Sequence, residues 1–246
     1  MAWSGGAHAG FSLGQLQSLA SMTQSSVDQV LQTIGEAMAY RAYMPAHSLG
    51  STIGLDVGVD ASMIQTPTEF NTIIQTVTGQ AVPGSIIVPH LNIHKGLPMN
   101  IDLGFTYLPN FSNVPTQKLE SIGFEGKWTP INMGSAGLNL GGRLTYDSAT
   151  LAFVSMSTIG VEAVGSFGLG IIEPYAALGF DETSATIDVS GATVPLPGGV
   201  KASGSYFVPK GHVGLALKLM FIKVAGQFDF HGSGGSSFGL KASLGF

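Results

Sequence analysis

The chain has 246 residues, a net charge of −5 and no cysteine, which excludes a disulfide framework or a thiolate metal site and argues against nucleic acid as a partner. Only 10% of its residues are charged, against about 25% in an ordinary soluble domain, and 44% are apolar. No apolar run reaches the roughly 20 residues that a membrane-spanning helix requires. These features favour a membrane β-barrel, in which apolar residues alternate with polar ones, over a soluble protein with a large core.

The first 47 residues differ from the rest of the chain. Residues 1–6 lack the basic start and the apolar core of a secretory signal, so we expect that an export signal has been removed. Residues 12–40 place apolar side chains three and four positions apart, which predicts one helix or two that end before Pro45. We interpret residues 1–47 as a helical plug or cap on a barrel of residues 48–246; the alternative is a helix packed on a soluble core.

From residue 48 onward, apolar positions alternate with polar or small ones, which predicts β-strands. The first such stretch, 48–63, is longer than the usual soluble strand of about 5–6 residues. We expect about ten strands, within a range of 10 to 12, because bacterial single-chain barrels have an even number. The predicted strands are 48–63, 84–94, 99–107, 121–128, 138–146, 158–163, 173–180, 213–219, 222–230 and 237–246.

The predicted connections are of two kinds. Short turns at 95–98, 132–135 and 168–170 alternate with longer connections at 64–82, 109–117 and 181–199, and a possible short helix lies at 68–77. Only a short loop at 147–150 breaks this pattern. Periplasmic turns and extracellular loops produce such an asymmetry, so the fold class we predict is all-β: a transmembrane, antiparallel, up-and-down barrel in the bacterial outer membrane.

Aromatic residues near the predicted strand ends support a membrane location. Tyr43, Tyr107, Trp128, Tyr146 and Phe246 are expected to form girdles at the two interfaces. The last ten residues, SFGLKASLGF, form an alternating strand that ends on Phe246. This strand resembles the closing strand of bacterial outer-membrane barrels, which implies that Phe246 acts as an assembly signal and that the barrel-assembly machinery and outer-membrane lipid are partners.

The amino-terminal third also resembles the long-chain fatty acid transporter (FadL-type) family. Its helical lead-in is followed by Tyr43-Met-Pro-Ala46 and a glycine-rich first strand, where the family has an Asn-Pro-Ala motif between its plug and its first strand. Met44 stands at the position of the family's asparagine. The resemblance implies a reduced or distant relative, with fewer strands than the family's fourteen, that handles hydrophobic small molecules or lipid.

Most charged residues fall on the alternating file that we expect to face the lumen. Two interpretations stay open for them: they line a narrow polar passage or anchor the plug, or they form salt bridges that merely fill a small barrel. The residues concerned are Asp56, Asp60, Asp102, Glu125, Lys127, Arg143, Glu162, Glu173, Lys218, Lys223, Asp229 and Lys241.

Other candidate chemistry is weak, and we expect neither a metal, a cofactor nor an enzyme. His90 and His94 would lie about 13 Å apart on one side of a strand, too far to share a metal ion. His231 and Ser233 could serve as base and nucleophile in a lipid-modifying enzyme, but their glycine-rich loop offers no rigid support. The first functional hypothesis is therefore passive transport of small hydrophobic molecules or lipids, and the alternative is a structural or partner-binding barrel that conducts nothing.

Overall fold

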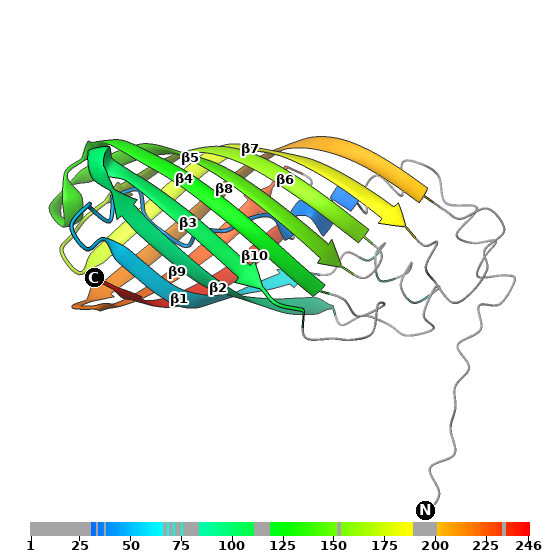
Figure 1. Cartoon of the computed structure of the whole chain (residues 1–246), viewed down its shortest axis with the longest axis horizontal. Coiled ribbons are helices and arrows are strands. Elements are labelled where there is room, and N and C mark those ends of the chain that lie inside the picture. Colours follow the sequence, from blue (N-terminus) through cyan, green and yellow to red (C-terminus); the bar gives the residue numbers. More distant parts are fainter. Residues whose placement is uncertain are drawn as a thin grey trace, which may run out of the picture.

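The chain folds into a closed barrel of antiparallel strands (Figure 1). The computed structural model describes residues 31–65 except 33 and 37, residues 68, 71 and 75, and residues 84–110, 119–151, 154–188, 201–232 and 235–246. Within these ranges there are ten strands, and each pairs with its neighbours in sequence. The strands are β1 (Leu55–Gln65), β2 (Ser85–Leu97), β3 (Ile101–Leu108), β4 (Leu119–Asn132), β5 (Leu138–Leu151), β6 (Val154–Phe167), β7 (Ile172–Asp188), β8 (Lys201–Leu219), β9 (Ile222–His231) and β10 (Ser236–Gly245).

Pairing of β1 with β10 closes the barrel. The backbone N–H of Phe246 donates to the carbonyl oxygen of Leu55 at 2.8 Å, and the N–H of Leu55 donates to Phe246 at 3.0 Å. Closure leaves no unpaired strand edge along this seam, which is the condition for a sheet to cross lipid. The predicted all-β fold with about ten antiparallel strands is confirmed.

The two ends of the barrel differ. At one end, here called the turn end, short connections join β2 to β3, β4 to β5, β6 to β7 and β8 to β9. Two of these hold 3-10 helices, Pro98–Asn100 and Gly134–Ala136, and the carboxyl terminus lies at the same end (Figure 1). The opposite end, here called the loop end, carries the connections 66–84, 109–118, 152–153, 189–200 and 232–235.

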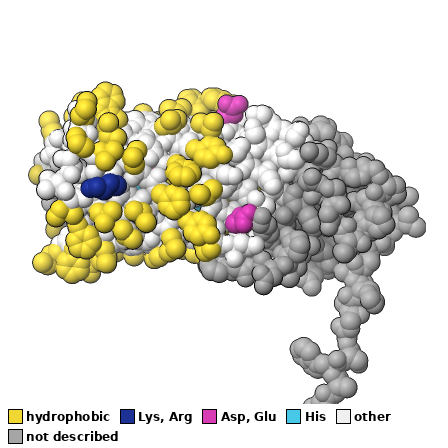
Figure 2. Space-filling model, in the orientation of Figure 1, with side chains coloured by type: hydrophobic (Ala, Val, Ile, Leu, Met, Phe, Trp, Pro, Cys, Tyr) yellow, Lys and Arg dark blue, Asp and Glu magenta, His cyan; other side chains and the backbone are white. Residues whose placement is uncertain are grey.

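A belt of apolar side chains surrounds the barrel on its outer face. In β10, for example, Phe238, Leu240 and Leu244 are exposed, whereas Lys241 between them is buried. Figure 2 shows the belt over the turn-end part of one face, with acidic side chains at its border toward the loop end. Glu182 lies at that border, in register with the exposed Ile159 and Phe207, and beyond it the outward positions of β7 and β8 are polar, as at Ser184 and Ser205. Strands β5 to β8 therefore project past the belt.

Four of the five predicted girdle residues lie on the outer face: Tyr107, Trp128, Tyr146 and Phe246 are all exposed. Tyr43 does not, because it lies inside the barrel with a relative exposure of 1%. The prediction for Tyr43 is wrong because this residue precedes the first strand and belongs to a segment that fills the lumen.

The first strand begins at Leu55 rather than at residue 48. Gly50 and Gly54 both have positive φ angles, 80° and 42°, which interrupt an extended strand and favour glycine. A β-carbon at Gly54 would overlap the carbonyl oxygen of Gly50, so only glycine fits there. The alternation of residues 48–54 is therefore not that of a paired strand, and its apolar members are not a buried file: Leu49 is half-buried and Ile53 is 62% exposed.

Several other boundaries differ from the sequence-based expectation. The predicted loop at 147–150 is part of β5, and the predicted turn at 95–98 begins only after β2 ends at Leu97. The predicted irregular connection at 181–199 contains the last residues of β7, which ends at Asp188. β8 likewise begins at Lys201, well before residue 213. Outward residues are polar beyond the belt, so the alternation of apolar residues fades there although the pairing continues.

The amino-terminal helix is described only in part. Residues 31, 32, 34–36 and 38 are helical, and the chain leaves the helix at Ala39, before Pro45. The helical plug predicted for residues 1–47 is not shown, because residues 1–30 lie outside the described ranges and residues 40–47 are not helical. Most of the possible helix at 68–77 also lies outside them. No helix among the described residues is long and apolar enough to cross a membrane.

Candidate functional site

A single segment of the chain fills the lumen from one end to the other. We call it the luminal segment and define it as residues 31–54. It enters at the loop end, passes through the barrel and reaches the turn end, where β1 begins (Figure 1). An eight-stranded barrel is just wide enough for its own inward side chains. A ten-stranded barrel is wider, and here an additional stretch of polypeptide occupies the extra width.

At the loop end the luminal segment packs into an apolar cluster. Leu31, Ile34 and Met38 of its helical part are buried against inward-facing residues of six strands. A β-carbon on Gly35 would touch the side chain of Thr183, which places this helical turn beside β7. The strand residues of the cluster are Ile64, Val88, Leu108, Ala149, Val154, Met156 and Ala185.

In the middle of the barrel two tyrosines and an arginine hold the segment. The hydroxyl of Tyr40 lies 3.2 Å from Nε2 of His94, and Nε of Arg41 lies 3.3 Å from Oδ2 of Asp229. Tyr43 shares a hydrogen bond with Ser62 and has a φ of 48°, a strained value for a residue with a side chain. A β-carbon at Gly239 would overlap the Tyr43 ring, so this glycine provides the space for it.

The backbone carbonyls that follow Tyr43 are bound by cations and hydroxyls of the barrel wall. Nη2 of Arg143 donates to the carbonyl of Met44 at 2.9 Å. Nζ of Lys127 donates to the carbonyls of Pro45 and His47 at 3.0 Å each, and the hydroxyl of Thr129 donates to Ala46 at 2.7 Å. A segment without regular secondary structure thus has its buried carbonyls satisfied by side chains from β4 and β5.

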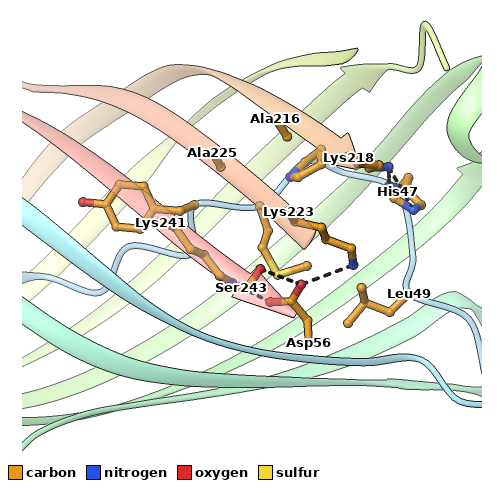
Figure 3. Close-up of a pocket in the computed structure, with 12 residues that line it drawn as sticks. His47, Leu49, Asp56, Ala216, Lys218, Lys223, Ala225, Lys241 and Ser243 are labelled. Carbon is orange, nitrogen blue, oxygen red and sulfur yellow. Dashed lines mark hydrogen bonds and ion pairs between the residues drawn. The ribbon is translucent and has the colours of Figure 1, made fainter. Parts of the chain in front are cut away.

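Near the turn end the segment is held by acidic residues. The hydroxyl of Ser48 and the N–H of Leu49 donate to Oδ1 of Asp102 at 3.0 and 3.1 Å. Nδ1 of His47 lies 3.1 Å from Oε2 of Glu173, which also pairs with Lys218. Figure 3 shows Lys218 directed at His47.

The wall residues also pair with one another. Arg143 lies between two carboxylates, with Nη1 2.9 Å from Oε2 of Glu162 and Nε 3.4 Å from Oε2 of Glu125. Lys210 bridges Glu162 and Asp181 at 3.0 and 2.7 Å.

At the turn end Asp56 accepts Lys241 at 2.9 Å and Lys223 at 3.2 Å (Figure 3). Charges buried to this degree are tolerated only when they are paired in this way.

Among the small cavities along the luminal segment, two lie against residues 40–49. The larger, about 20 Å³, lies near the turn end between the segment and Lys218, Lys223 and Lys241 (Figure 3). The smaller, about 10 Å³, lies beside Arg41 and His212. The larger cavity has room for about one water molecule, far less than a solute would need.

The structure places the twelve predicted lumen residues on the inner face, and all except the partly exposed Lys218 and Lys223 are buried. They do not surround one shared pocket. They form separate groups along the barrel: Asp56 with Lys223 and Lys241; Asp102 with Lys127; Glu125 and Glu162 with Arg143; Glu173 with Lys218; Asp60 with His90; and Asp229 with Arg41.

Sequence reasoning missed several members of these groups. Lys210, Asp181 and Asp147 are buried on the inner face, but the predicted strands did not extend to them. Their even spacing from residues predicted to face inward could have indicated them. Asp147 is four positions from Arg143 and Asp181 is eight positions from Glu173, so both lie on the same face of the strand. Tyr40 ends the helix predicted for residues 12–40 and Arg41 follows it, and nothing in their spacing indicated contacts with the barrel wall.

The histidines have structural partners. Nδ1 of His90 lies 3.1 Å from Asp60, and His94 lies between Tyr40 and Lys241. Among the described residues no group of three or more His, Asp or Glu side chains could hold a metal ion. His231 ends β9, whereas Ser233, its suggested partner in lipid chemistry, lies outside the described residues.

No family model matches the chain, and no curated protein matches it. Several solved structures are similar to it. The N-terminal β-barrel domain of Pseudomonas aeruginosa OprF is 11% identical with a TM-score of 0.37, over 78% of this chain and 97% of that one. Ail, the attachment invasion locus protein of Yersinia pestis, is 9% identical with a TM-score of 0.38, over 78% and 94%. Neisserial surface protein A is 11% identical with a TM-score of 0.30, over 78% and 97%.

Similarity this low carries no conclusion about the function of the chain. The resemblance to the FadL-type family is not supported, since no family model matches. In place of a family motif, the carbonyls of Met44, Pro45 and Ala46 are simply points at which the barrel wall holds the luminal segment.

Proposed function

We propose that this protein is an outer-membrane barrel that anchors itself in lipid and keeps its lumen closed, which makes it a structural or partner-binding barrel and not a passive channel. The apolar belt and the closed sheet support insertion in lipid, which would be its first partner, with the barrel-assembly machinery as the second. The observation that carries the proposal is the luminal segment, whose carbonyls are hydrogen-bonded by side chains of β4 and β5 and whose Arg41 pairs with Asp229 on β9. No catalytic role is part of this proposal.

Single-channel recording in planar lipid bilayers tests the closed lumen. The intact protein is expected to give no discrete conductance steps, because its lumen is filled. A variant that lacks residues 1–48 is expected to give such steps, because water and ions replace the segment between the remaining charged side chains.

A variant that lacks only residues 1–30 is the matched control, since it keeps the luminal segment, and it is expected to stay silent. Equal conductance of the intact protein and the 1–48 deletion would contradict the proposal.

The apolar cluster at the loop end favours a second candidate function, the binding of a hydrophobic molecule. Inward positions of a membrane barrel are usually polar, but here Ile64, Val88 and Leu108 form an apolar inner wall that Leu31 and Ile34 cover. A fluorescent fatty acid is therefore expected to bind a variant that lacks residues 1–38, reconstituted in lipid nanodiscs. The 1–30 deletion keeps the covering residues and is expected not to bind; equal binding by both variants would exclude this wall as the site.

A further inference from the structure

The path of the luminal segment has a consequence for the residues that precede it. We infer that the barrel holds the part of the chain before Leu31 on the outer surface of the membrane, so that the protein displays its own amino-terminal segment there. This goes beyond the closed lumen proposed above, because it concerns what the barrel presents and not what it conducts.

The direction of the segment is established by its contacts. Leu31, Ile34 and Met38 lie in the cluster with Leu108, at the last position of β3, and Val154, at the first position of β6. Both of these strand residues are at the loop end. Ten to seventeen residues later in the chain, Ser48 bonds Asp102, at the opposite end of β3. The chain therefore crosses the barrel once, from the loop end to the turn end.

The helical part lies at or beyond the border of the apolar belt. Gly35 lies against Thr183, and the outward neighbours of Thr183 on β7 are the exposed Glu182 and Ser184. Glu182 is in register with the exposed Ile159 and Phe207 and marks the edge of the belt, whereas Ser184 is in register with Ser205 and lies beyond it. Leu31, one helical turn before Gly35 and on the loop-end side, therefore lies past the edge of the belt on the side of β7.

The chain before Leu31 has no way back. The lumen is occupied by residues 31–54, and the larger of the two cavities against residues 40–49 is about 20 Å³. The wall is closed because β1 pairs with β10. From Leu31, the six residues back to Ser25 reach at most about 22 Å when fully extended, which is less than the apolar height of about 25 Å that they would have to cross.

Which side the loop end faces follows from the connections. In bacterial outer-membrane barrels, short turns face the periplasm and longer loops face the exterior. Here the longest connections, 66–84, 109–118 and 189–200, are all at the loop end. The segment before Leu31 is then outside the cell, and Phe246 is on the periplasmic side. Since β1 follows the luminal segment directly, the amino-terminal residues must enter the barrel before β1 and β10 pair.

The chain has no cysteine, so single cysteines can report the side of the membrane. The variants are Ser25→Cys before the luminal segment, Ser184→Cys as the loop-end control and Met133→Cys as the turn-end control, since Ser184 and Met133 are both exposed. Each is expressed in a Gram-negative host and treated with a membrane-impermeant maleimide, in intact cells and after permeabilisation of the outer membrane. Heat-modifiable gel migration verifies that each variant is folded.

In intact cells the thiols at positions 25 and 184 are expected to react and the thiol at position 133 is not; all three should react after permeabilisation. If position 25 behaves like position 133 and unlike position 184, the threading is wrong. If position 133 reacts in intact cells and position 184 does not, the orientation is wrong.

Proteinase K provides a second measurement on the unmodified chain. Added to intact cells, it is expected to remove residues before Leu31 and leave the barrel, as read from the mass of the remaining fragment. The inference is wrong if neither the maleimide nor the protease reaches this part of the chain from outside. Conductance plays no part in either measurement, so a failure here is separate from a failure of the closed lumen.

Discussion

Replacing Arg143 with methionine is expected to lower the free energy of unfolding by about 3–5 kcal/mol, because it leaves buried carboxylates without their cation. Glu162 would keep Lys210 at 3.0 Å, whereas the ion pair left to Glu125 is the one with His94, whose Nε2 is 3.9 Å away. The carbonyl of Met44 would also lose its donor. The measurement is the urea dependence of the folded fraction, read from heat-modifiable migration of the protein in lipid vesicles.

Two further variants separate loss of the charge pair from loss of a side chain. Lys95→Met removes a cation on the outer face that donates to the carbonyl of Ile53, and it should change stability by less than about 1 kcal/mol. Adding Glu125→Gln to Arg143→Met should recover part of the loss, since it removes the unpaired charge. A loss below about 1 kcal/mol for Arg143→Met would contradict the assigned role of the ion pair.

Replacing Leu240 with arginine is expected to destabilise the inserted barrel by about 2–4 kcal/mol, the cost of an arginine at the middle of a membrane's apolar layer. Leu240 is 52% exposed in the middle of β10 and belongs to the apolar belt. The residue after it, Lys241, shows that a cation is accepted on the inner face of the same strand, where Asp56 lies 2.9 Å away. The same urea titration in vesicles measures the difference.

Ser184→Arg is the matched control, because Ser184 also points outward but lies beyond the belt. Its cost should be about 0–1 kcal/mol, as for positions outside the apolar layer. Equal costs at positions 184 and 240 would mean that the belt does not face lipid, and the proposed membrane location would then be wrong.

The strand predictions were most accurate where the outer face is apolar. Around Leu103 and Leu240, apolar and polar residues alternate with a period of two, and the predicted and observed strands agree closely. Around Glu182 and Ser184 both faces carry polar residues, so the pattern carried no signal although β7 continues to Asp188. The residues missed in the lumen, such as Asp181 and Lys210, lie in these same stretches.

The inward direction of the charged residues could be predicted, as could pairing between neighbouring strands, but their contacts with the luminal segment could not. Arg143 and Glu162 face each other because β5 and β6 are neighbours, a pairing that an up-and-down order makes foreseeable. Contact between Arg143 and the carbonyl of Met44 joins residues 99 positions apart. Nothing in the local sequence around Met44 distinguishes an irregular luminal segment from a helix that ends near Pro45.

The sequence by itself determined that this protein is a closed, antiparallel β-barrel of about ten strands, because side chains alternate between the two faces of a strand and the lipid-facing side must be apolar. Only the tertiary structure decided that residues 31–54 cross the lumen and close it. The reason is that a segment without regular secondary structure has no periodicity of its own: its conformation depends on the wall residues that bind its carbonyls, such as Lys127, Thr129 and Arg143, and these come from distant parts of the chain.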